Sequence, residues 1–412
     1  MVHRHLPLAL LALAFVVTIA APAAARTKPE LVADGLTFPT NIAISPDGRI
    51  FYTEKETGDI RIIADGRVLR EPFDHLDVIG GGETGLLGIA LHPDFAAQPW
   101  VYVYYSDAAD GRNRLIRILA DGDTGTERQN MVDGLSASSG YHNGGDLVFG
   151  LDGRLFLSLG EAHEAERAQD PNDIGGKVIR IEADGTLAAD NPFGPDNPVY
   201  SIGHRNSFGL CVDPANGDLW ETENGPGSDD EVNLIVAGAN YGWPDQLGPG
   251  GAPTFVDPVV DYRAVIVPTG CAVWQGDLFV GSYGTGLLHR IGLPAEPGAA
   301  VDDVVARFDH GITDVVSGPD GDLYVTTSDA IWRFSGDAAP SSPIPVPSPS
   351  APPDVAGPGD GGTIARLLGT VAAIAAATGL VMRFLAGRRL HRELRAPGED
   401  GQSPGPGASG AG

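Results

Sequence analysis

The sequence predicts an all-β fold, a six-bladed β-propeller, with an N-terminal signal peptide and a C-terminal transmembrane helix. Three observations support this prediction. A strand–turn–strand pattern recurs six times in the middle of the chain. The 412 residues include 57 glycines and 33 prolines, which suit tight turns between short strands better than helical packing. An apolar run also lies near each end of the chain.

Each repeat has an apolar strand, a turn with Pro, Asp or Gly, and a second strand rich in β-branched and aromatic residues. The six copies read PTNIAISPDGRIFYTE, GLLGIALHPDFAAQPWVYVYYS, HNGGDLVFGLDGRLFLSLG, NSFGLCVDPANGDLWETENG, PTGCAVWQGDLFVGSYG and ITDVVSGPDGDLYVTTSD. One small sheet cannot bury both of its faces, so similar sheets are expected to stack around an axis. A β-sandwich is the alternative, but it does not require six similar hairpins. The early stretch RTKPELVADGLTF is expected to close the ring with the last blade.

Composition divides the chain into five segments. They are a signal peptide (1–25), the propeller (26–336), a Pro/Gly-rich linker (337–362), a transmembrane helix (363–387) and a basic, then disordered, cytoplasmic tail (388–412). The signal peptide is predicted because basic residues precede an apolar run and small residues that permit cleavage. The repeated prolines of the linker predict an extended spacer without a core.

The C-terminal apolar run, LLGTVAAIAAATGLVM, is uncharged and is followed by several arginines. Extended to residue 387, the run is long enough to cross a bilayer, and the basic cluster after it favours an orientation with the propeller outside. A soluble amphipathic helix is the alternative. We therefore expect a single-pass protein of the cell membrane, with the propeller on the extracytoplasmic side.

Charge and cysteine content narrow the classes of partner. The formal net charge of −27, from 54 acidic and 27 basic residues, would repel nucleic acid, so no nucleic-acid partner is expected. The two cysteines, Cys211 and Cys271, could pair in an oxidising compartment or stay reduced. The sequence leaves both possibilities open.

Candidate site residues precede or surround the predicted inner strands, which places them at one rim of the central channel. Glu83 lies in GGETGLLG, His142 in YHNGG, and Arg205 with Asn206 in GHRNSFGL. A histidine can remove a proton from a hydroxyl near neutral pH, so His142 is the predicted base. Four other histidines are given structural roles only: His75, His163, His289 and His391.

The stretch ENGPGSDDEVNLI is a candidate calcium loop. Backbone carbonyls at Gly225 and Pro226, with the carboxylates that follow them, offer the hard oxygen ligands that Ca²⁺ prefers. The alternative is a solvated acidic loop, since the spacing is not that of an EF-hand.

Across about residues 30–335, the chain resembles the glucose/sorbosone dehydrogenase family. The resemblance is carried by GLLGIALHPDF, HNGGDLVFGLDGRLFLSLG, GKVIRI, YSIGHRNSFGL, ENGPGSDDEVNLIVAGANYGWP and DVVSGPDGDLYV, in family order. It implies a propeller that binds pyrroloquinoline quinone (PQQ) and Ca²⁺ at the channel mouth. His142 would take the proton of the C1 hydroxyl of a sugar or aldose while hydride passes to the quinone. An external electron acceptor would then reoxidise the cofactor.

The resemblance also implies roles for the other candidate residues. Arg205 and Asn206 match contacts to the quinone, and Glu83 matches a polar side chain near the substrate. The backbone oxygens of Gly225 and Pro226 match the ligands of the cofactor's Ca²⁺. A second, structural Ca²⁺ region is matched by three residues, Asp230, Glu231 and Tyr241.

The chain departs from the family pattern where cationic partners of the PQQ carboxylates are usual. Many members place two arginines before the last inner strand, where this chain has Gly311 and Thr313, and a lysine in the loop that here reads GSYGTG. These departures favour an alternative, a non-catalytic propeller that binds a glycan or protein partner. A third reading, a Ca²⁺-dependent lactonase-like hydrolase, would need an inward ring of Glu, Asn and Asp that the sequence does not show.

Overall fold

The computed structural model describes residues 28–137, 140–298 and 300–336. Apart from residues 26–27, these ranges cover the predicted propeller almost completely. The predicted signal peptide, linker, transmembrane helix and tail lie outside the described residues. Within the described ranges, no helix has the length and apolar character needed to cross a bilayer.

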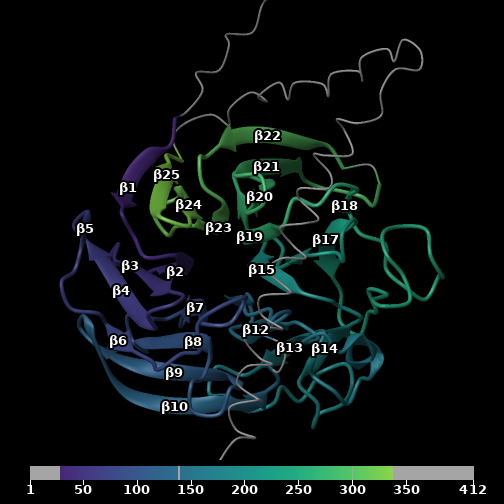
Figure 1. The fold of residues 1–412 in the computed structure, drawn as a ribbon, viewed down its shortest axis with the longest axis horizontal. Coiled ribbons are helices and arrows are strands. Elements are labelled where there is room, and N and C mark those ends of the chain that lie inside the picture. Colours follow the sequence, from purple (N-terminus) through teal and green to yellow (C-terminus); the bar gives the residue numbers. More distant parts are fainter. Residues whose placement is uncertain (1–27, 138–139, 299, 337–412) are drawn as a thin grey trace, which may run out of the picture. The chain divides into compact units, whose positions relative to one another are not determined.

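Six antiparallel sheets form the ring of blades shown in Figure 1. From the inner strand outward, the first blade contains β2 (Pro39–Ile44), β3 (Ile50–Glu54), β4 (Asp59–Ala64) and β5 (Arg67–Val68), and β6 (Asp74–His75) also pairs with β4. The second blade contains β7 (Leu86–Leu91), β8 (Trp100–Ser106), β9 (Asn113–Asp121) and β10 (Thr124–Leu135). The third blade contains β11 (Leu147–Phe149), β12 (Leu155–Leu159), β13 (Lys177–Ile181) and β14 (Val199–Ile202). A single 3₁₀ turn among the described residues, η1 (Ala165–Gln169), joins β12 to β13.

The last three blades follow the same order. The fourth blade contains β15 (Ser207–Val212), β16 (Leu219–Glu223), β17 (Asp230–Ile235) and β18 (Val260–Tyr262). The fifth blade contains β19 (Pro268–Trp274), β20 (Asp277–Ser282), β21 (Leu287–Gly292) and β22 (Asp302–Arg307). The sixth blade contains β23 (Ile312–Ser317), β24 (Leu323–Thr327), β25 (Ala330–Phe334) and β1 (Glu30–Asp34). Each inner strand contacts the inner strand of the next blade, and β23 contacts β2. The all-β, six-bladed propeller is thus confirmed.

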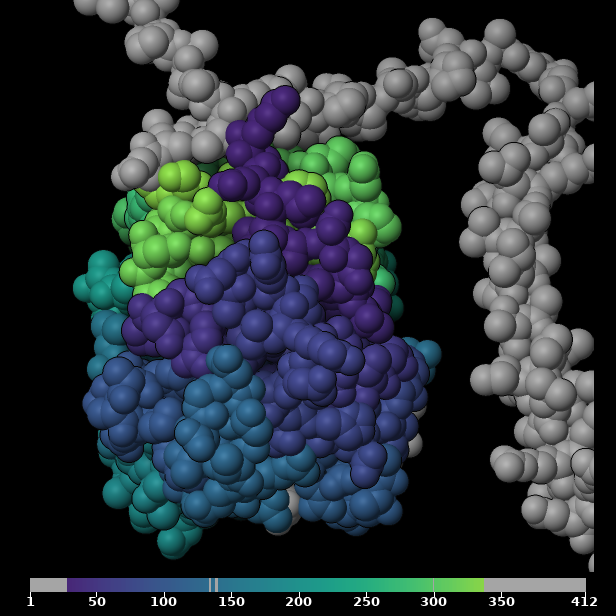
Figure 2. Space-filling model, turned by 90° about the vertical axis from the view of Figure 1, so that its left-hand side faces the viewer, coloured from purple at the N-terminus to yellow at the C-terminus, as the bar shows by residue number. Residues whose placement is uncertain are grey.

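The first strand completes the last blade. β1 pairs antiparallel with β25, with Glu30 opposite Arg333 and Leu31 opposite Trp332. Figure 2 shows the purple N-terminal strand lying against the yellow-green end of the propeller. The expected closure of the ring by the early stretch is therefore confirmed.

The hydrophobic core is divided among the contacts between neighbouring blades. Six buried clusters occupy the six interfaces; in the first, Phe51 of β3 packs against Phe73, Phe95 and Val103. The second strand of each blade is buried over almost its whole length, as in β3 and β12. Because blade stacking supplies the apolar burial, the loops at the channel rim are free to carry polar side chains.

The inner strands of the fourth and fifth blades are joined covalently. Cys211 of β15 and Cys271 of β19, 60 residues apart, form a disulfide. This pairing settles the alternative that the sequence left open.

Removing this disulfide is expected to destabilise the propeller. A variant with Cys211→Ala and Cys271→Ala should lose about 2–4 kcal/mol of unfolding free energy, because the unfolded chain regains the freedom of a long closed loop. Denaturant titration without reductant measures the loss. Wild-type protein titrated with reductant is the control and should resemble the variant; equal stability of the variant and the oxidised wild type would contradict the prediction.

Polar side chains on the inner strands narrow the channel and link the blades. Asp314 of β23 accepts a hydrogen bond from the backbone N–H of Ile42 at 2.9 Å, and Asp146 accepts one from Leu210 at 2.6 Å. Asn41 accepts a similar bond from the second blade at 2.9 Å. Asn41 and Asp146 line both a cavity of about 380 Å³ and a second one of about 440 Å³. Asn41 and Asp146 therefore lie between the two cavities. We call these two residues, together with Asp314, the waist of the channel.

This waist is expected to make stability depend on pH. Burial raises the pKa of Asp146 to about 6, and burial with the nearby charge of Asp146 raises the pKa of Asp314 well above its usual 3.8. Both carboxyl groups hold their protons more tightly in the folded protein than in the unfolded chain, so low pH favours the folded state. This stabilisation is complete below pH 3.8 and is lost as pH rises through about 6. We expect the unfolding free energy to fall by on the order of 2 kcal/mol between about pH 4 and about pH 6.5.

Urea titrations across this pH range test the expectation. Carboxylates whose pKa is lowered, such as Asp47 at about 2, add stability up to about pH 5, so the fall from about pH 5 to about pH 6.5 is the decisive part. Glu231 and Glu223, whose pKa values are also raised, act in the same direction. An unfolding free energy that stays level or rises from pH 4 to pH 6.5 would contradict it.

Candidate active site at the channel mouth

The cavity of about 380 Å³ lies at the end of the channel where the inner strands begin. Its volume falls in the range of small-molecule sites, about 300–1,000 Å³. Its walls come from the first residues of inner strands, the segments that precede them, and residues that follow the second strands of blades: Phe38, Thr40, Asn41, Lys55, Gly82, Glu83, Leu87, Gly144, Gly145, Asp146, Phe208, Val267, Thr269, Tyr283 and Thr313. The predicted gathering of such segments at one rim is what the structure shows.

His142 lies next to this cavity and is held by a buried carboxylate. Its imidazole Nδ1 is 2.9 Å from both carboxylate oxygens of Glu161, and the His142 residue is only 7% exposed. His142 has a left-handed backbone, with φ of 55°, which directs the chain sharply into β11. Because a carboxylate only accepts hydrogen bonds, Nδ1 carries the proton that joins the pair.

The other imidazole nitrogen of His142 faces two neighbours. Arg205 Nη2 lies 2.9 Å from Nε2, and His163 Nε2 lies 3.0 Å from it. A guanidinium can only donate, so Nε2 of His142 accepts and carries no proton. His142 thus has the protonation state that a general base requires.

Glu161 and His163 were not found from the sequence as site residues. The ring of His163 meets that of His142 edge-on, with centroids 3.9 Å apart, and stacks on Tyr141 with centroids 5.8 Å apart. Both residues follow β12, and the adjacent Ala162 and His163 are left-handed, with φ of 55° and 62°. An acidic residue just after the second strand of the base's own blade is the sequence signal that could have identified Glu161.

Glu83 connects the base to Asn206. One carboxylate oxygen of Glu83 accepts the backbone N–H of His142 at 2.6 Å and the side-chain amide of Asn206 at 3.0 Å. The amide oxygen of Asn206 accepts the N–H of Gly144 at 3.2 Å. The structure therefore brings together Glu83, His142 and Asn206, from the second, third and fourth blades.

Arg205 joins this group to the candidate calcium loop. Its Nη1 donates to the backbone oxygen of Asn224 at 2.7 Å and to that of Gly225 at 3.0 Å. Its guanidinium carbon is 5.4 Å from the ring centroid of Trp243. The carbonyl of Gly225 thus already faces a positive charge, while Pro226, the next residue, is exposed.

The residues of the predicted second calcium region are not gathered at one point. The carboxylate of Asp230 accepts the backbone N–H groups of Gly225, Ile266 and Val267 at 2.7–2.9 Å, so it shapes the loop. Glu231 and Tyr241 line a separate small cavity. Burial raises the pKa of Glu231 to about 7.

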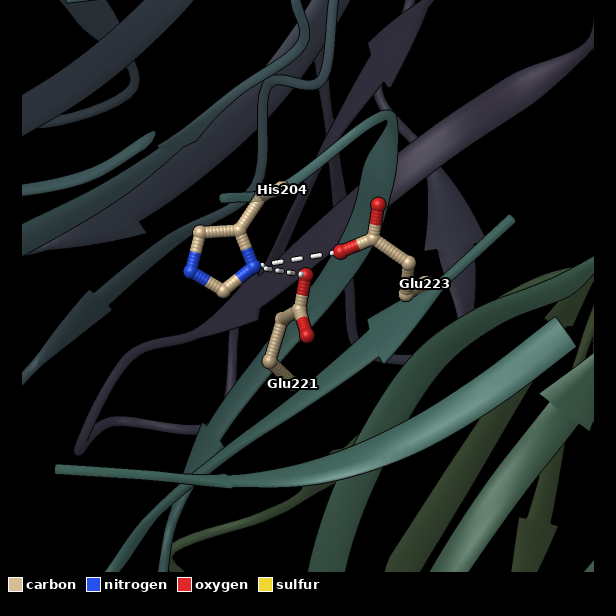
Figure 3. A group of neighbouring side chains, drawn as sticks. All are labelled: His204, Glu221 and Glu223. Carbon is tan, nitrogen blue, oxygen red and sulfur yellow. Dashed lines mark hydrogen bonds and ion pairs between the residues drawn. The ribbon is translucent and has the colours of Figure 1, made fainter. Parts of the chain in front are cut away.

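A buried cluster beneath Arg205 contains His204, Glu221 and Glu223 (Figure 3). His204 Nδ1 is 3.1 Å from Glu223 and 3.3 Å from Glu221. Glu223 also accepts the backbone N–H groups of Arg205 and Asn206. The cluster therefore fixes the backbone from which both candidate site residues project.

The charges in this cluster favour a structural role over metal binding. Burial alone would lower the pKa of His204, but Glu221 and Glu223 outweigh it and raise the pKa to about 9. Burial and the charge of Glu221 raise the pKa of Glu223 to about 8. The two glutamates hold His204 as their ion-pair partner, and Glu223 also accepts two backbone N–H groups, so we interpret the cluster as an ion-paired support.

Comparison with known proteins agrees with this geometry. A family profile described as Glucose / Sorbosone dehydrogenase matches residues 36–333. The aldose sugar dehydrogenase YliI of Escherichia coli (strain K12) is 30% identical over 352 residues, 75% of this chain and 92% of that protein. Quinoprotein glucose dehydrogenase B of Acinetobacter calcoaceticus is 32% identical over 252 residues, 53% of this chain and 52% of that protein. The PQQ-bound aldose sugar dehydrogenase structure from Streptomyces coelicolor gives a TM-score of 0.70 at 32% identity, covering 77% of this chain and 99% of that one.

Proposed function

The chain belongs to the glucose/sorbosone dehydrogenase family, and from this premise we propose that it is a PQQ- and Ca²⁺-dependent dehydrogenase that oxidises the C1 hydroxyl of aldose sugars. The observation that carries the proposal is the placement of His142 beside a cavity of about 380 Å³, with its Nδ1 held by Glu161 and its Nε2 facing Arg205. The printed names of the relatives describe dehydrogenases of sugars, one of them a quinoprotein.

The walls of the cavity fit a flat, carboxylated quinone. Phe38, Phe208 and Tyr283 provide aromatic and apolar surface, and Gly144 and Gly145 add backbone to the same wall. Lys55 adds a positive charge to the same wall. Arg205 and Asn206 would hold the quinone at the side nearest His142.

A bound PQQ supplies the acceptor for the hydride that leaves C1 of the sugar. The chain itself supplies the base: Glu161 keeps the proton on Nδ1 of His142, so Nε2 takes the hydroxyl proton. Because Arg205 and His163 contact the same Nε2 at 2.9 and 3.0 Å, the substrate hydroxyl must replace both contacts. Glu83, in the wall beside the base, would face the sugar.

Calcium would be held by the backbone oxygens of Gly225 and Pro226. The support for this role is that backbone oxygens are the hard ligands that Ca²⁺ prefers. The Gly225 oxygen accepts a hydrogen bond from Arg205 at 3.0 Å, so the ion would have to replace this contact. For the second calcium region, we propose that Glu231 and Tyr241 contribute where they line the small cavity. Asp230 would act through the loop that it fixes.

The test is reconstitution of the purified chain with PQQ and Ca²⁺. We expect reduction of an artificial electron acceptor when aldoses are added, and a higher melting temperature with PQQ than without it. Omitting Ca²⁺, or adding a chelator, should abolish the activity. Absence of both turnover and a melting shift would overturn the proposal and favour the alternative of a non-catalytic propeller that binds a glycan or protein.

The location of the protein is a separate proposal. We propose that residues 363–387 anchor the chain in the cell membrane with the propeller on the extracytoplasmic side, where an external electron acceptor can reach it. The apolar run and its following arginines support this, and a disulfide such as Cys211–Cys271 suits an oxidising compartment. Protease treatment of intact cells should degrade the propeller; full protection of the propeller would contradict the orientation.

A further inference from the structure

One side chain stands out in the cavity wall because of its charge. Among the described residues that line the cavity, Lys55 is the single cation. It follows β3, and it is only 8% exposed. Its ammonium is 2.8 Å from the half-exposed carboxylate of Glu56 and 5.6 Å from the ring centroid of Phe38. A buried ammonium has three donors, and this partner uses one of them.

The carboxylates in the same wall do not compete for Lys55. Glu83 is engaged by the N–H of His142 and the amide of Asn206. Burial raises the pKa of Asp146 to about 6, and its oxygens accept three hydrogen bonds from Asn41 and two backbone N–H groups. Lys55 keeps its ion pair with Glu56, and the remaining donors of its ammonium are available to an anionic group in the cavity.

At Gly311, beside the wall residue Tyr283, there is no room for a long cationic side chain. A Cβ atom at Gly311 would lie 2.5 Å from the backbone oxygen of Tyr283 and 2.6 Å from its ring. Tyr283 itself lies in the loop where the family pattern has a lysine, and it packs on Phe38 with ring centroids 6.1 Å apart. An aromatic wall formed by Tyr283 and Phe38 thus leads from the position of the absent arginine to Lys55.

We propose that Lys55 binds a carboxylate of the cofactor, replacing the cationic partners that Gly311, Thr313 and the GSYGTG loop lack. The proposal rests on the proposed function and adds the residue that recognises the cofactor's charge. Lys55 forms a charge-assisted hydrogen bond to the carboxylate, while Phe38 and Tyr283 cover the flat ring beside it. The cationic contact has moved from the fifth and sixth blades to the first.

Binding of PQQ to the full-length chain, measured without turnover, tests this role. PQQ is titrated in the presence of Ca²⁺ while the quenching of tryptophan fluorescence is followed. Lys55→Met should weaken binding by about 10- to 100-fold, the effect of one lost charge-assisted bond. Lys55→Arg keeps the charge and should stay within a few-fold of wild type. Lys28→Met removes the same charge from an exposed position and is the matched control, expected to bind as wild type does.

The outcomes separate this proposal from the proposed function. If wild type binds PQQ and Lys55→Met binds equally well, the role of Lys55 is overturned and PQQ dependence stands. If Lys55→Arg is as weak as Lys55→Met, charge recognition is likewise overturned. If wild type fails to bind PQQ, both proposals fall. Thermal melting of each variant without ligand establishes that the propeller is folded.

Discussion

Replacing His142 with glutamine is expected to lower kcat for sugar oxidation by about 10²- to 10⁴-fold, the usual contribution of a general base. The amide has no basic nitrogen, so the C1 hydroxyl proton has no acceptor at this position. PQQ binding should change little, because the cofactor contacts assigned to Arg205 and Lys55 remain. Steady-state kinetics with saturating PQQ and Ca²⁺ measure kcat, and fluorescence titration measures PQQ binding.

His75→Gln is the matched control for this substitution. His75 is half-exposed, is bonded to Asp59 at 2.8 Å, and lies outside the cavity wall. Its replacement should leave kcat within a few-fold of wild type. A His142→Gln variant that retains wild-type kcat would remove His142 from the mechanism, whatever its effect on cofactor binding.

Removing the buried cation of the His204 cluster is expected to have the largest effect on stability. His204→Ala leaves the buried charge of Glu221 without its positive partner, and breaking a buried ion pair in this way costs about 3–5 kcal/mol. The backbone N–H groups of Arg205 and Asn206 are bonded to Glu223, so PQQ binding should weaken as well. Urea denaturation measures the loss of unfolding free energy.

His289→Ala removes the same side chain from another buried position and serves as the comparison. His289 of β21 is also buried but pairs with one carboxylate, that of Asp302, which is partly exposed. Its loss should cost clearly less than the loss of His204. Equal losses for the two variants would show that cavity formation, and not the unpaired charge of Glu221, determines the effect.

The fold could be predicted because each blade repeats a local pattern. Alternation and turn residues mark the first two strands of every blade, and the position before an inner strand identified His142, Glu83 and Arg205. The disulfide could not be decided, because Cys211 and Cys271 come into contact only when two inner strands are set side by side.

The remaining site residues depend on contacts between blades and on backbone conformations that a sequence pattern does not contain. Glu161 and His163 reach His142 because two consecutive non-glycine residues turn left-handed after β12. The contact of Tyr283 with Gly311 joins two different blades. These positions follow from packing in three dimensions, so local propensity gives no signal for them.

The pairing of β1 with β25 also affects how the protein is made. Glu30 and Arg333, which form an ion pair across this joint, are 303 residues apart in the chain. During synthesis, the edge of β1 therefore stays unsatisfied until nearly the whole domain has left the ribosome, and such distant pairing slows folding. A prematurely terminated chain would expose this edge permanently, which makes truncated products prone to aggregate.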